Sequence, residues 1–280
     1  MPIELWIDDG KPWYLSNSIW LVPGTDPAGA PGLPVVDRPA FVWARVINRG
    51  SAAVPDVTVR FYWGDPSTLI RRKSDAKLIG VSNVSLAAGE AKEVLCLTPW
   101  IPVWVNGGHE CLIVEAFSSG DPLSPHGEDD PFNPVRDRHT AQRNLAVLKV
   151  SSSARLVVAP FAIGNSPLLR VKEVTVRVKR LPLRNMEEGK TLFGFTRLPE
   201  EMTDDLMYGI RPFRCGEPVE ESGEPVLTIP LEPDRKQAMA FTLKLPERRD
   251  AGACFLIEQF VHDQVVGGIV ALITPEHLND

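Results

Sequence analysis

Apolar and polar residues alternate along several short stretches of the chain. Residues 57–63, 174–179 and 239–245 each place apolar side chains at every second position, with polar or small ones between them. Turn-forming residues such as Gly64-Asp65-Pro66 separate these stretches. A period of two is typical of an antiparallel strand with one face on a core and the other in water. No ten-residue stretch has a clean helical period, so we predict an all-β fold in which helices are minor.

An internal similarity divides the chain into two parts. The pattern Cys-x-x-x-Glu-x-Phe occurs at residues 111–117 and again at 254–260, 143 residues later. Each copy follows a loop that contains Gly and precedes another apolar run, at 145–150 and at 269–273. A spacing of about half the chain predicts two related units in tandem.

The serine run 151–153 is the natural linker between the two units, since it directly follows the first of those apolar runs. Short strands with frequent turns are typical of immunoglobulin-like sandwiches. We therefore predict two tandem Ig-like antiparallel β-sandwiches. Residues 1–150 form the first, with a Trp- and Pro-rich N-terminal segment, and residues 151–280 form a diverged second one.

Composition narrows the class of protein. The 280 residues include 26 Pro, nearly twice the average of about 5%, which argues against long helices and coiled coils. A hydrophobic fraction of 44% is too high for a disordered chain. The net charge of −6 is shared equally by the two halves, so neither offers a basic surface to nucleic acid.

The sequence also bears on the cellular compartment. The N-terminus has no basic stretch followed by an apolar one, and no run of 18 apolar residues occurs, so we expect no export signal and no membrane insertion. The four Cys form neither a Cys-x-x-Cys pair nor a dense framework, which favours reduced thiols. We expect a cytoplasmic protein, or an extracellular one if an export signal has been removed.

The segment from Ala44–Gly50 through Val57–Pro66 resembles bacterial CARDB-type immunoglobulin-like domains. The later features of that family follow in order: a turn at Leu86–Glu90, Pro99, Gly108, the strand Cys111–Glu115 and a closing Ala141–Val147. The resemblance covers about residues 40–150, and the second half is linked to it only by the internal repeat. It implies an Ig-like fold and a non-catalytic module of a kind that repeats within extracellular proteins.

Aromatic residues are the first candidates for binding. Trp100 and Trp104 lie in an apolar loop, where exposed tryptophans would stack on sugars or anchor a protein interface. Buried, they would instead cap the end of the sandwich core, and both interpretations stay open. Trp13 belongs to the Pro-rich segment 1–34, which we expect to drape over this domain or a neighbour. We predict Trp100, Trp104, Trp13 and Phe132 as partner-binding residues.

The loop 121–139 contains Phe132 and concentrates carboxylates and two His. Ca²⁺ takes six to eight oxygen ligands, several of which such a loop could supply. The spacing of an EF-hand is absent, and Arg136 and Arg138 alternate with the acidic residues. We therefore favour a solvated or salt-bridged loop, ordered by packing on its own domain or on a partner, and we predict neither a metal nor a cofactor.

The sequence contains little evidence for a catalytic site. Glu115 and Glu258 occupy the same position of the two copies, but an acid–base pair needs carboxylates within about 5–10 Å, and equivalent positions of separate domains rarely meet. We expect each to face solvent or to pair with a neighbouring Arg. Gly189-Lys190-Thr191 lacks the Gly that a phosphate-binding loop requires at position 184. We predict no catalytic residue and no enzyme.

The sequence thus predicts a non-catalytic structural or protein-interaction protein, a component or adaptor of a larger bacterial assembly, whose protein partner it does not identify. The alternative is a carbohydrate- or Ca-binding module that uses the Trp100/Trp104 loop or the acidic loop 121–139.

Overall fold

The computed structural model describes residues 2–103, 110–202, 206–213, 223–246, 250–276 and 278. Strands dominate this part of the chain. The helical elements within it are 3-10 turns at Pro167–Leu169 (η2), Leu183–Met186 (η3) and Lys190–Phe193 (η4). The predicted all-β fold class is confirmed.

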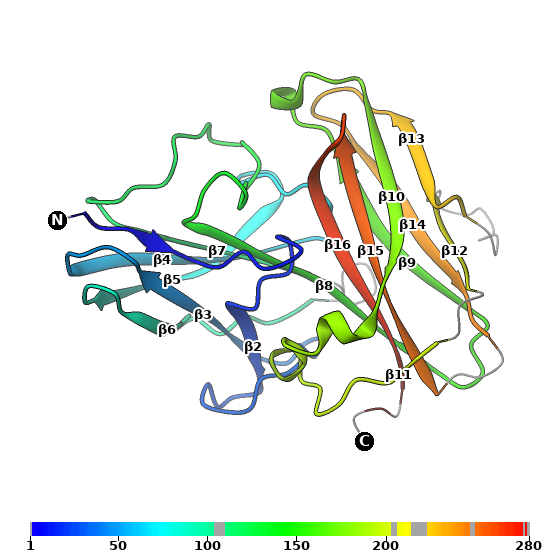
Figure 1. Ribbon diagram of the computed structural model, residues 1–280, viewed down its shortest axis with the longest axis horizontal. Helices are drawn as coiled ribbons and strands as arrows, with labels where there is room; N and C mark the ends of the chain where they lie inside the picture. The colour runs from blue at the N-terminus through cyan, green and yellow to red at the C-terminus, as the bar shows by residue number, and fades with distance from the viewer. Residues whose placement is uncertain are drawn as a thin grey trace.

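The first half of the chain (residues 1–150) forms two layers (Figure 1). Strand β3 pairs with β1, β2 and β6 in a small sheet, and the order β5-β4-β7-β8 makes up the opposing layer. The alternating stretch 57–63 lies in β4, and Val57, Val59 and Phe61 are buried between the layers. The strands are β1 (Leu5–Trp6), β2 (Ile19–Pro23), β3 (Ala40–Asn48), β4 (Val54–Gly64), β5 (Ala76–Leu86), β6 (Ala91–Leu95), β7 (Glu110–Phe117) and β8 (Thr140–Val150).

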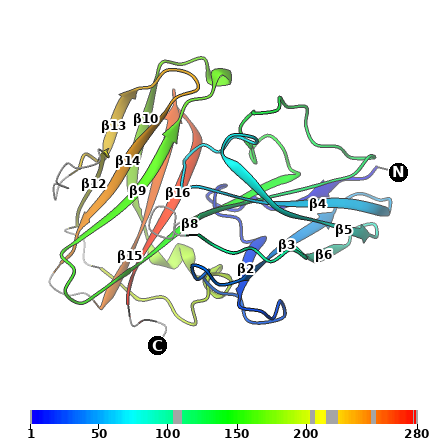
Figure 2. The same ribbon diagram turned by 180° about the vertical axis from the view of Figure 1, so that it is seen from behind.

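The second half (residues 151–280) is also layered (Figure 2). A small sheet in the order β12-β14-β9 packs against β13-β10-β15-β16. The alternating valines 174, 176 and 178 lie in β10 and face the core between these layers. The strands are β9 (Leu156–Gly164), β10 (Glu173–Leu181), β11 (Glu200–Glu201), β12 (Met207–Pro212), β13 (Val226–Pro230), β14 (Lys236–Lys244), β15 (Ala251–Val261) and β16 (Gln264–Pro275).

The larger layers of the two halves are parts of one sheet. β8 pairs in parallel with β16, so the strand order β13-β10-β15-β16-β8-β7-β4-β5 runs through both halves (Figure 1). This parallel pair departs from the purely antiparallel sheets expected from the sequence. Its strands are apolar on both faces, as is usual for parallel strands, which are covered on both sides. The division into domains at residue 150 and the origin of the halves by duplication stay predictions.

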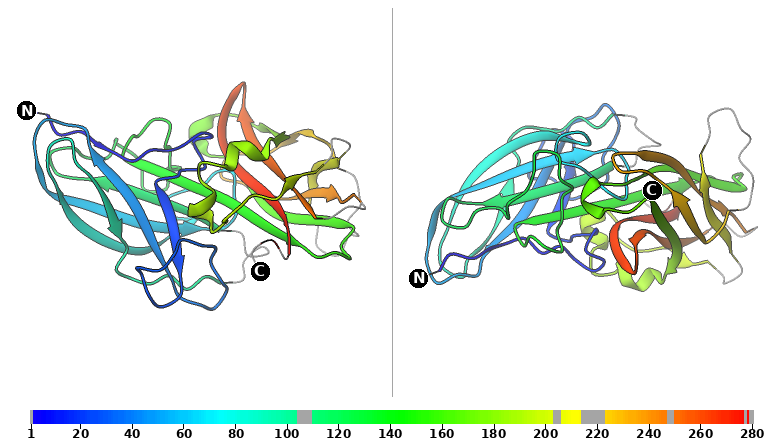
Figure 3. Two further views of the ribbon diagram at one scale, coloured as in Figure 1. Left: turned by 60° about the horizontal axis from the view of Figure 1, so that its bottom comes forward. Right: turned by 90° about the horizontal axis from the view of Figure 1, so that it is seen from above.

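The small sheets cover opposite faces of this shared sheet. Leu145 of β8 and its partner Val270 of β16 lie on one face, which in the first half carries the core under β1, β2, β3 and β6. Leu148 and its partner Ile273 lie on the other face, against the core of the second half. The two halves are therefore arranged end to end, with β8 running from one into the other (Figure 3).

A loop from the first half is hydrogen-bonded into the second. Thr68 donates its amide to the carbonyl oxygen of Ala162 at 3.0 Å, and Ala162 donates its own to Pro66 at 2.9 Å. The Thr68 hydroxyl donates to Oε1 of the buried Gln259 at 2.5 Å. Asn144 of β8 donates to the carbonyl oxygens of Ser67 and Gly268. These buried polar groups all find partners, so the loop fixes one half against the other.

Candidate functional site

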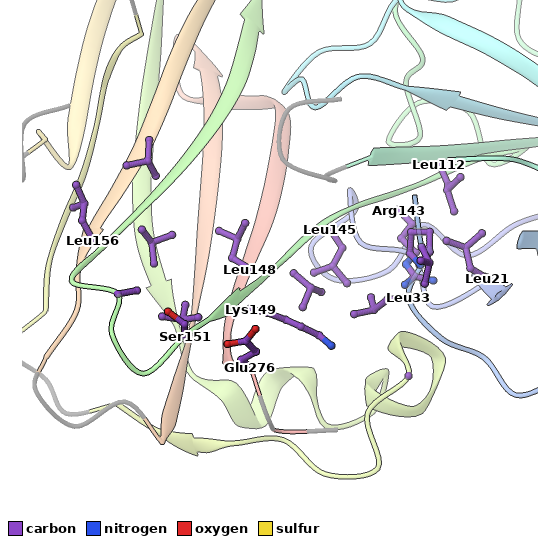
Figure 4. Close-up of a pocket in the computed structure, with 18 of the residues that line it drawn as sticks. Leu21, Leu33, Leu112, Arg143, Leu145, Leu148, Lys149, Ser151, Leu156 and Glu276 are labelled. Carbon is purple, nitrogen blue, oxygen red and sulfur yellow. The ribbon is translucent and has the colours of Figure 1, made fainter. Parts of the chain in front are cut away.

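A cavity of about 770 Å³ lies where β8 passes from the first half to the second (Figure 4). Its described walls come mainly from β2, β7, β8 and β9 and from the segment 33–35. Most of these wall residues are aliphatic or aromatic. The polar side chains are Arg143, Lys149, Ser151 and Glu276, and Lys149 and Glu276 are solvent-exposed. The volume falls within the roughly 300–1,000 Å³ of small-molecule sites.

Arg143 is the buried cation of this wall, with only 4% of its surface exposed. Its Nη1 donates to the carbonyl oxygens of Ile19 at 3.3 Å and Leu192 at 3.5 Å, and its guanidinium lies 4.7 Å from the ring centre of Phe193. Among the described residues Arg143 forms no ion pair, and both of its hydrogen bonds come from Nη1. Burial lowers the pKa of Arg143 to about 9. A buried guanidinium without a counter-charge is costly, which makes this residue the most informative feature of the cavity.

Trp100 forms another part of the wall and is 4% exposed. Its backbone pairs with Ala40 through two hydrogen bonds of 2.8 Å, and its ring lies 6.1 Å from that of Trp63. Its Nε1 is buried without a hydrogen-bond partner in the described structure. This burial agrees with the core-capping interpretation of Trp100, and its part in partner binding stays a prediction.

The other predicted partner-binding residues are placed differently from one another. Trp104 lies outside the described residues. Trp13 is half-buried and makes an edge-on contact with Tyr14, with 5.4 Å between the ring centres. Phe132 is buried against Tyr62, under the guanidinium of Arg72. The structure thus does not bring the predicted residues together, and a role of any of them in partner binding stays a prediction.

The two segments that contain Val35 and Trp100 of the cavity wall also carry exposed apolar side chains. Four of the exposed large hydrophobic residues of the described chain belong to two neighbouring segments, and we call them the apolar strip: Val35, Leu97, Ile101 and Val103. The segments are joined because Asp37 donates its amide to Pro102 at 2.9 Å. Val35 also lines the cavity. Trp100 and Pro102 point inward while Ile101 and Val103 are exposed, so the apolar loop predicted from the sequence has one face on the core and one in solvent.

The acidic loop 121–139 is closed by a buried histidine. His139 places Nδ1 2.6 Å from Asp137 and Nε2 3.2 Å from Asp121. Burial acts to lower the pKa of His139, but its contacts with the two carboxylates outweigh this and leave that pKa raised. Burial acts to raise the pKa of Asp137, and hydrogen bonds from His139 and Ser124 outweigh it, leaving the pKa at about 2. Of the solvated and the salt-bridged loop that the sequence left open, the structure shows the salt-bridged one.

The outer carboxylates of the loop have separate protein partners. Glu128 pairs with Lys73, Asp129 accepts hydrogen bonds from the amides of Lys73 and Ser74, and Asp130 accepts one from Gly127. No group of three or more His, Cys, Asp or Glu suited to a metal ion occurs among the described residues. The calcium-binding alternative therefore gains no support from this loop.

Glu115 and Glu258 are both buried, so the expectation that they face solvent is wrong. The alternative, pairing with a neighbouring Arg, holds for Glu115, which forms an ion pair with Arg72 and accepts a 3.2 Å hydrogen bond from Tyr62. Glu258 pairs instead with Lys179 at 2.9 Å and accepts a 2.9 Å hydrogen bond from Tyr14. Each carboxylate thus accepts a hydrogen bond from one tyrosine and forms an ion pair with one cation, which is a structural role.

Arg143 is the residue that the sequence reasoning missed. It stands two positions from Ala141 and two from Leu145, both buried on the same face of β8. Residues two apart in a strand share a face, so this spacing was a signal that the arginine points toward the core. No helix within the described chain has the length and apolar character needed to cross a membrane.

Comparisons with known proteins give little beyond this geometry. A scan against protein-family models and a search of curated proteins each found no match. Solved structures that resemble the chain include the CARDB domain of a Pyrococcus furiosus protein, crystallised in complex with di-metal ions. The match has 16% identity and a TM-score of 0.29, and it covers 50% of this chain and 89% of that one. Another is the exo-chitosanase of Amycolatopsis orientalis, with 11% identity and a TM-score of 0.21. It covers 85% of this chain but only 25% of the enzyme, so the chain spans about a quarter of that protein's length.

Proposed function

We propose that the chain is a non-catalytic protein-interaction module, an adaptor or component of a larger assembly, which binds a protein partner through the apolar strip. The observation that carries this proposal is the exposure of Val35, Leu97, Ile101 and Val103, which are 54%, 73%, 57% and 40% exposed, on two hydrogen-bonded segments. Exposed apolar side chains that are grouped on neighbouring segments are typical of sites of association.

The backbone under the strip is held before any partner arrives. Trp100 pairs with Ala40 on one side of Ile101, and Pro102 accepts the amide of Asp37 on the other. Pro99 and Pro102 further restrict the chain. A surface that is already ordered loses little conformational entropy on binding, so even a small apolar contact can be stable.

Site-specific photo-cross-linking tests this proposal. A photoreactive amino acid is placed at position 101 and, as a matched control, at Leu168, which is 60% exposed on the second half. We expect one protein to be cross-linked to the chain when the photoreactive residue is at position 101 and not when it is at position 168. The captured protein is then purified and its affinity measured for the wild-type chain and for the variants Ile101→Asp and Leu168→Asp.

The proposal predicts that Ile101→Asp weakens binding at least about tenfold, because a charge would be buried against apolar surface, whereas Leu168→Asp leaves it within about twofold. Capture of a second copy of this chain, with a concentration-dependent dimer that Ile101→Asp dissolves, would replace the adaptor role with self-association. Equal capture at both positions, or no binding between the purified proteins, would refute the proposal.

A further inference from the structure

The geometry points to the cavity beside β8 as a binding site for a small molecule with a carboxylate head group and an apolar body, such as a medium-chain fatty acid. This inference goes beyond the protein-interaction role proposed above, because it concerns a small-molecule ligand in the cavity, which shares only Val35 with the apolar strip. It rests on Arg143 and on the apolar wall that extends from it.

The head-group site is the unused edge of the Arg143 guanidinium. Nη1 is occupied by the carbonyl oxygens of Ile19 and Leu192, and one face of the group lies over Phe193. Nε and Nη2 are left, without acceptors among the described residues. These two donors point the same way and fit the two oxygens of one carboxylate in parallel hydrogen bonds. A carboxylate would also supply the counter-charge that this buried cation lacks.

The apolar body would lie along the rest of the wall. Figure 4 shows Arg143 close to Leu21, Leu33 and Leu112, with Leu145 between it and the end where Lys149 and Glu276 are drawn. At that end the charges of Lys149 and Glu276 offset each other, whereas no carboxylate opposes an anion at Arg143 in the part of the chain that the structure describes. The charged group is therefore expected at Arg143 and the chain along the aliphatic wall.

Calorimetric titration of the full chain with three ten-carbon ligands tests this arrangement. Decanoate carries the required charge, 1-decanol has the same body without it, and decyltrimethylammonium reverses it. All are used as monomers, with the wild type and with Arg143→Met, which keeps the length of the side chain but removes its charge. Lys149→Met is the matched control, since Lys149 is a cation of the same wall that is exposed to solvent.

We expect the wild type to bind decanoate at least about tenfold more tightly than decanol and to reject the ammonium compound. Arg143→Met should lose that preference while it keeps its affinity for decanol, and Lys149→Met should change decanoate binding less than about threefold. Retained decanol binding shows that Arg143→Met is folded. If Arg143→Met does not fold, the variant Val147→Trp replaces it in the test. This variant leaves Arg143 in place and narrows the cavity, so it must lower the affinity for both decanoate and decanol.

Three results would overturn the inference. Absence of saturable decanoate binding by the wild type below the micellar concentration would show that the cavity is not such a site. Equal binding of decanoate by the wild type and Arg143→Met, or equal binding of all three ligands, would show that the guanidinium does not recognise the head group. None of these results decides the test of the apolar strip, which uses a different ligand and different variants.

Discussion

The junction between the halves makes one substitution especially informative. Gly267 lies in β16 against the loop that enters from the first half, and a methyl group at this position would overlap the carbonyl oxygen of Thr68. The obstacle is backbone, which cannot swing away as a flexible side chain does. Gly267→Ala must therefore push the loop off the second half.

The cost follows from the hydrogen bonds that this displacement breaks. Three anchor the loop: Thr68 to Ala162, Ala162 to Pro66, and the Thr68 hydroxyl to Gln259. A hydrogen bond of this kind contributes about 0.5–1.5 kcal/mol net, so their joint loss destabilises the fold by about 2–4 kcal/mol. Gln259 is fully buried, but its Oε1 also accepts a hydrogen bond from the amide of Gly164 at 3.3 Å, so the loss of the Thr68 hydroxyl adds no penalty for an unpartnered group.

Urea unfolding of Gly267→Ala against the wild type measures this loss. The matched control is Gly89→Ala, where φ is +72° but an added methyl group meets nothing within 4 Å. Gly89→Ala should lower the free energy of unfolding by only about 1–2 kcal/mol, the backbone strain of a non-glycine residue in the left-handed region. Amide hydrogen exchange should show lost protection at Thr68 and Ala162 in the Gly267 variant and unchanged protection in β3. A free energy of unfolding for Gly267→Ala within about 1 kcal/mol of the wild type would refute the reasoning.

Three further outcomes are expected. Because folding raises the pKa of His139, the protonated His139 stabilises the fold fully at pH values below 6.5, its ordinary pKa, and this stabilisation is lost as the pH rises above that value. The urea midpoint of the wild type should therefore fall as the pH rises through this range, and that of His139→Gln should not. Asp137, whose pKa is lowered to about 2, contributes stability that is lost as the pH falls below about 3.8, so Asp137→Asn should flatten the acid limb of the same curve. Glu115→Ala should lower the free energy of unfolding by about 3 kcal/mol in urea, because Arg72 then stays partly buried without its counter-charge. Tyr62→Phe should lower it by only about 1 kcal/mol, and equal losses would contradict this ranking.

Much of the strand content could be predicted from the sequence, because the period of two reports directly which side chains face a core. The stretches 57–63 and 174–179 both became strands with their valines buried. The parallel pairing of β8 with β16 was not predicted, although residues 145–150 and 269–273 are apolar at adjacent positions. Such runs are typical of strands covered on both faces, but a run of this kind does not name its partner strand.

The candidate site was harder to predict because burial there depends on segments far apart in the sequence. Arg143 is covered by contacts with Ile19, Leu192 and Phe193, and no local pattern brings these three together. Trp100 was correctly placed in an apolar loop, but only the pairing with Ala40 decides that it turns inward. Local sequence patterns therefore predicted which segments are apolar, but they did not predict which residues are in contact in the folded protein.

The opposite placement of the two small sheets accounts for the remaining elaborations of the chain. Each half leaves one face of the shared sheet without a small sheet of its own. In the first half that face is covered by Ile70 and Phe132, the latter from the acidic loop. In the second half it is covered by Tyr14 and Leu15 of the N-terminal segment and by residues of the 183–195 region.

The buried glutamates follow from the same geometry. Glu115 lies on the face that the acidic loop covers, and Glu258 lies on the face that the N-terminal segment covers. In an isolated sandwich both positions would be open to water, which is what the strand pattern alone implies. Because these covers exclude water, each carboxylate needs a tyrosine and a cation, and Tyr14 and Tyr62 serve both as cover and as hydrogen-bond donor. The segments that look like irregular additions in the sequence thus cover the faces of the shared sheet that the two small sheets leave open.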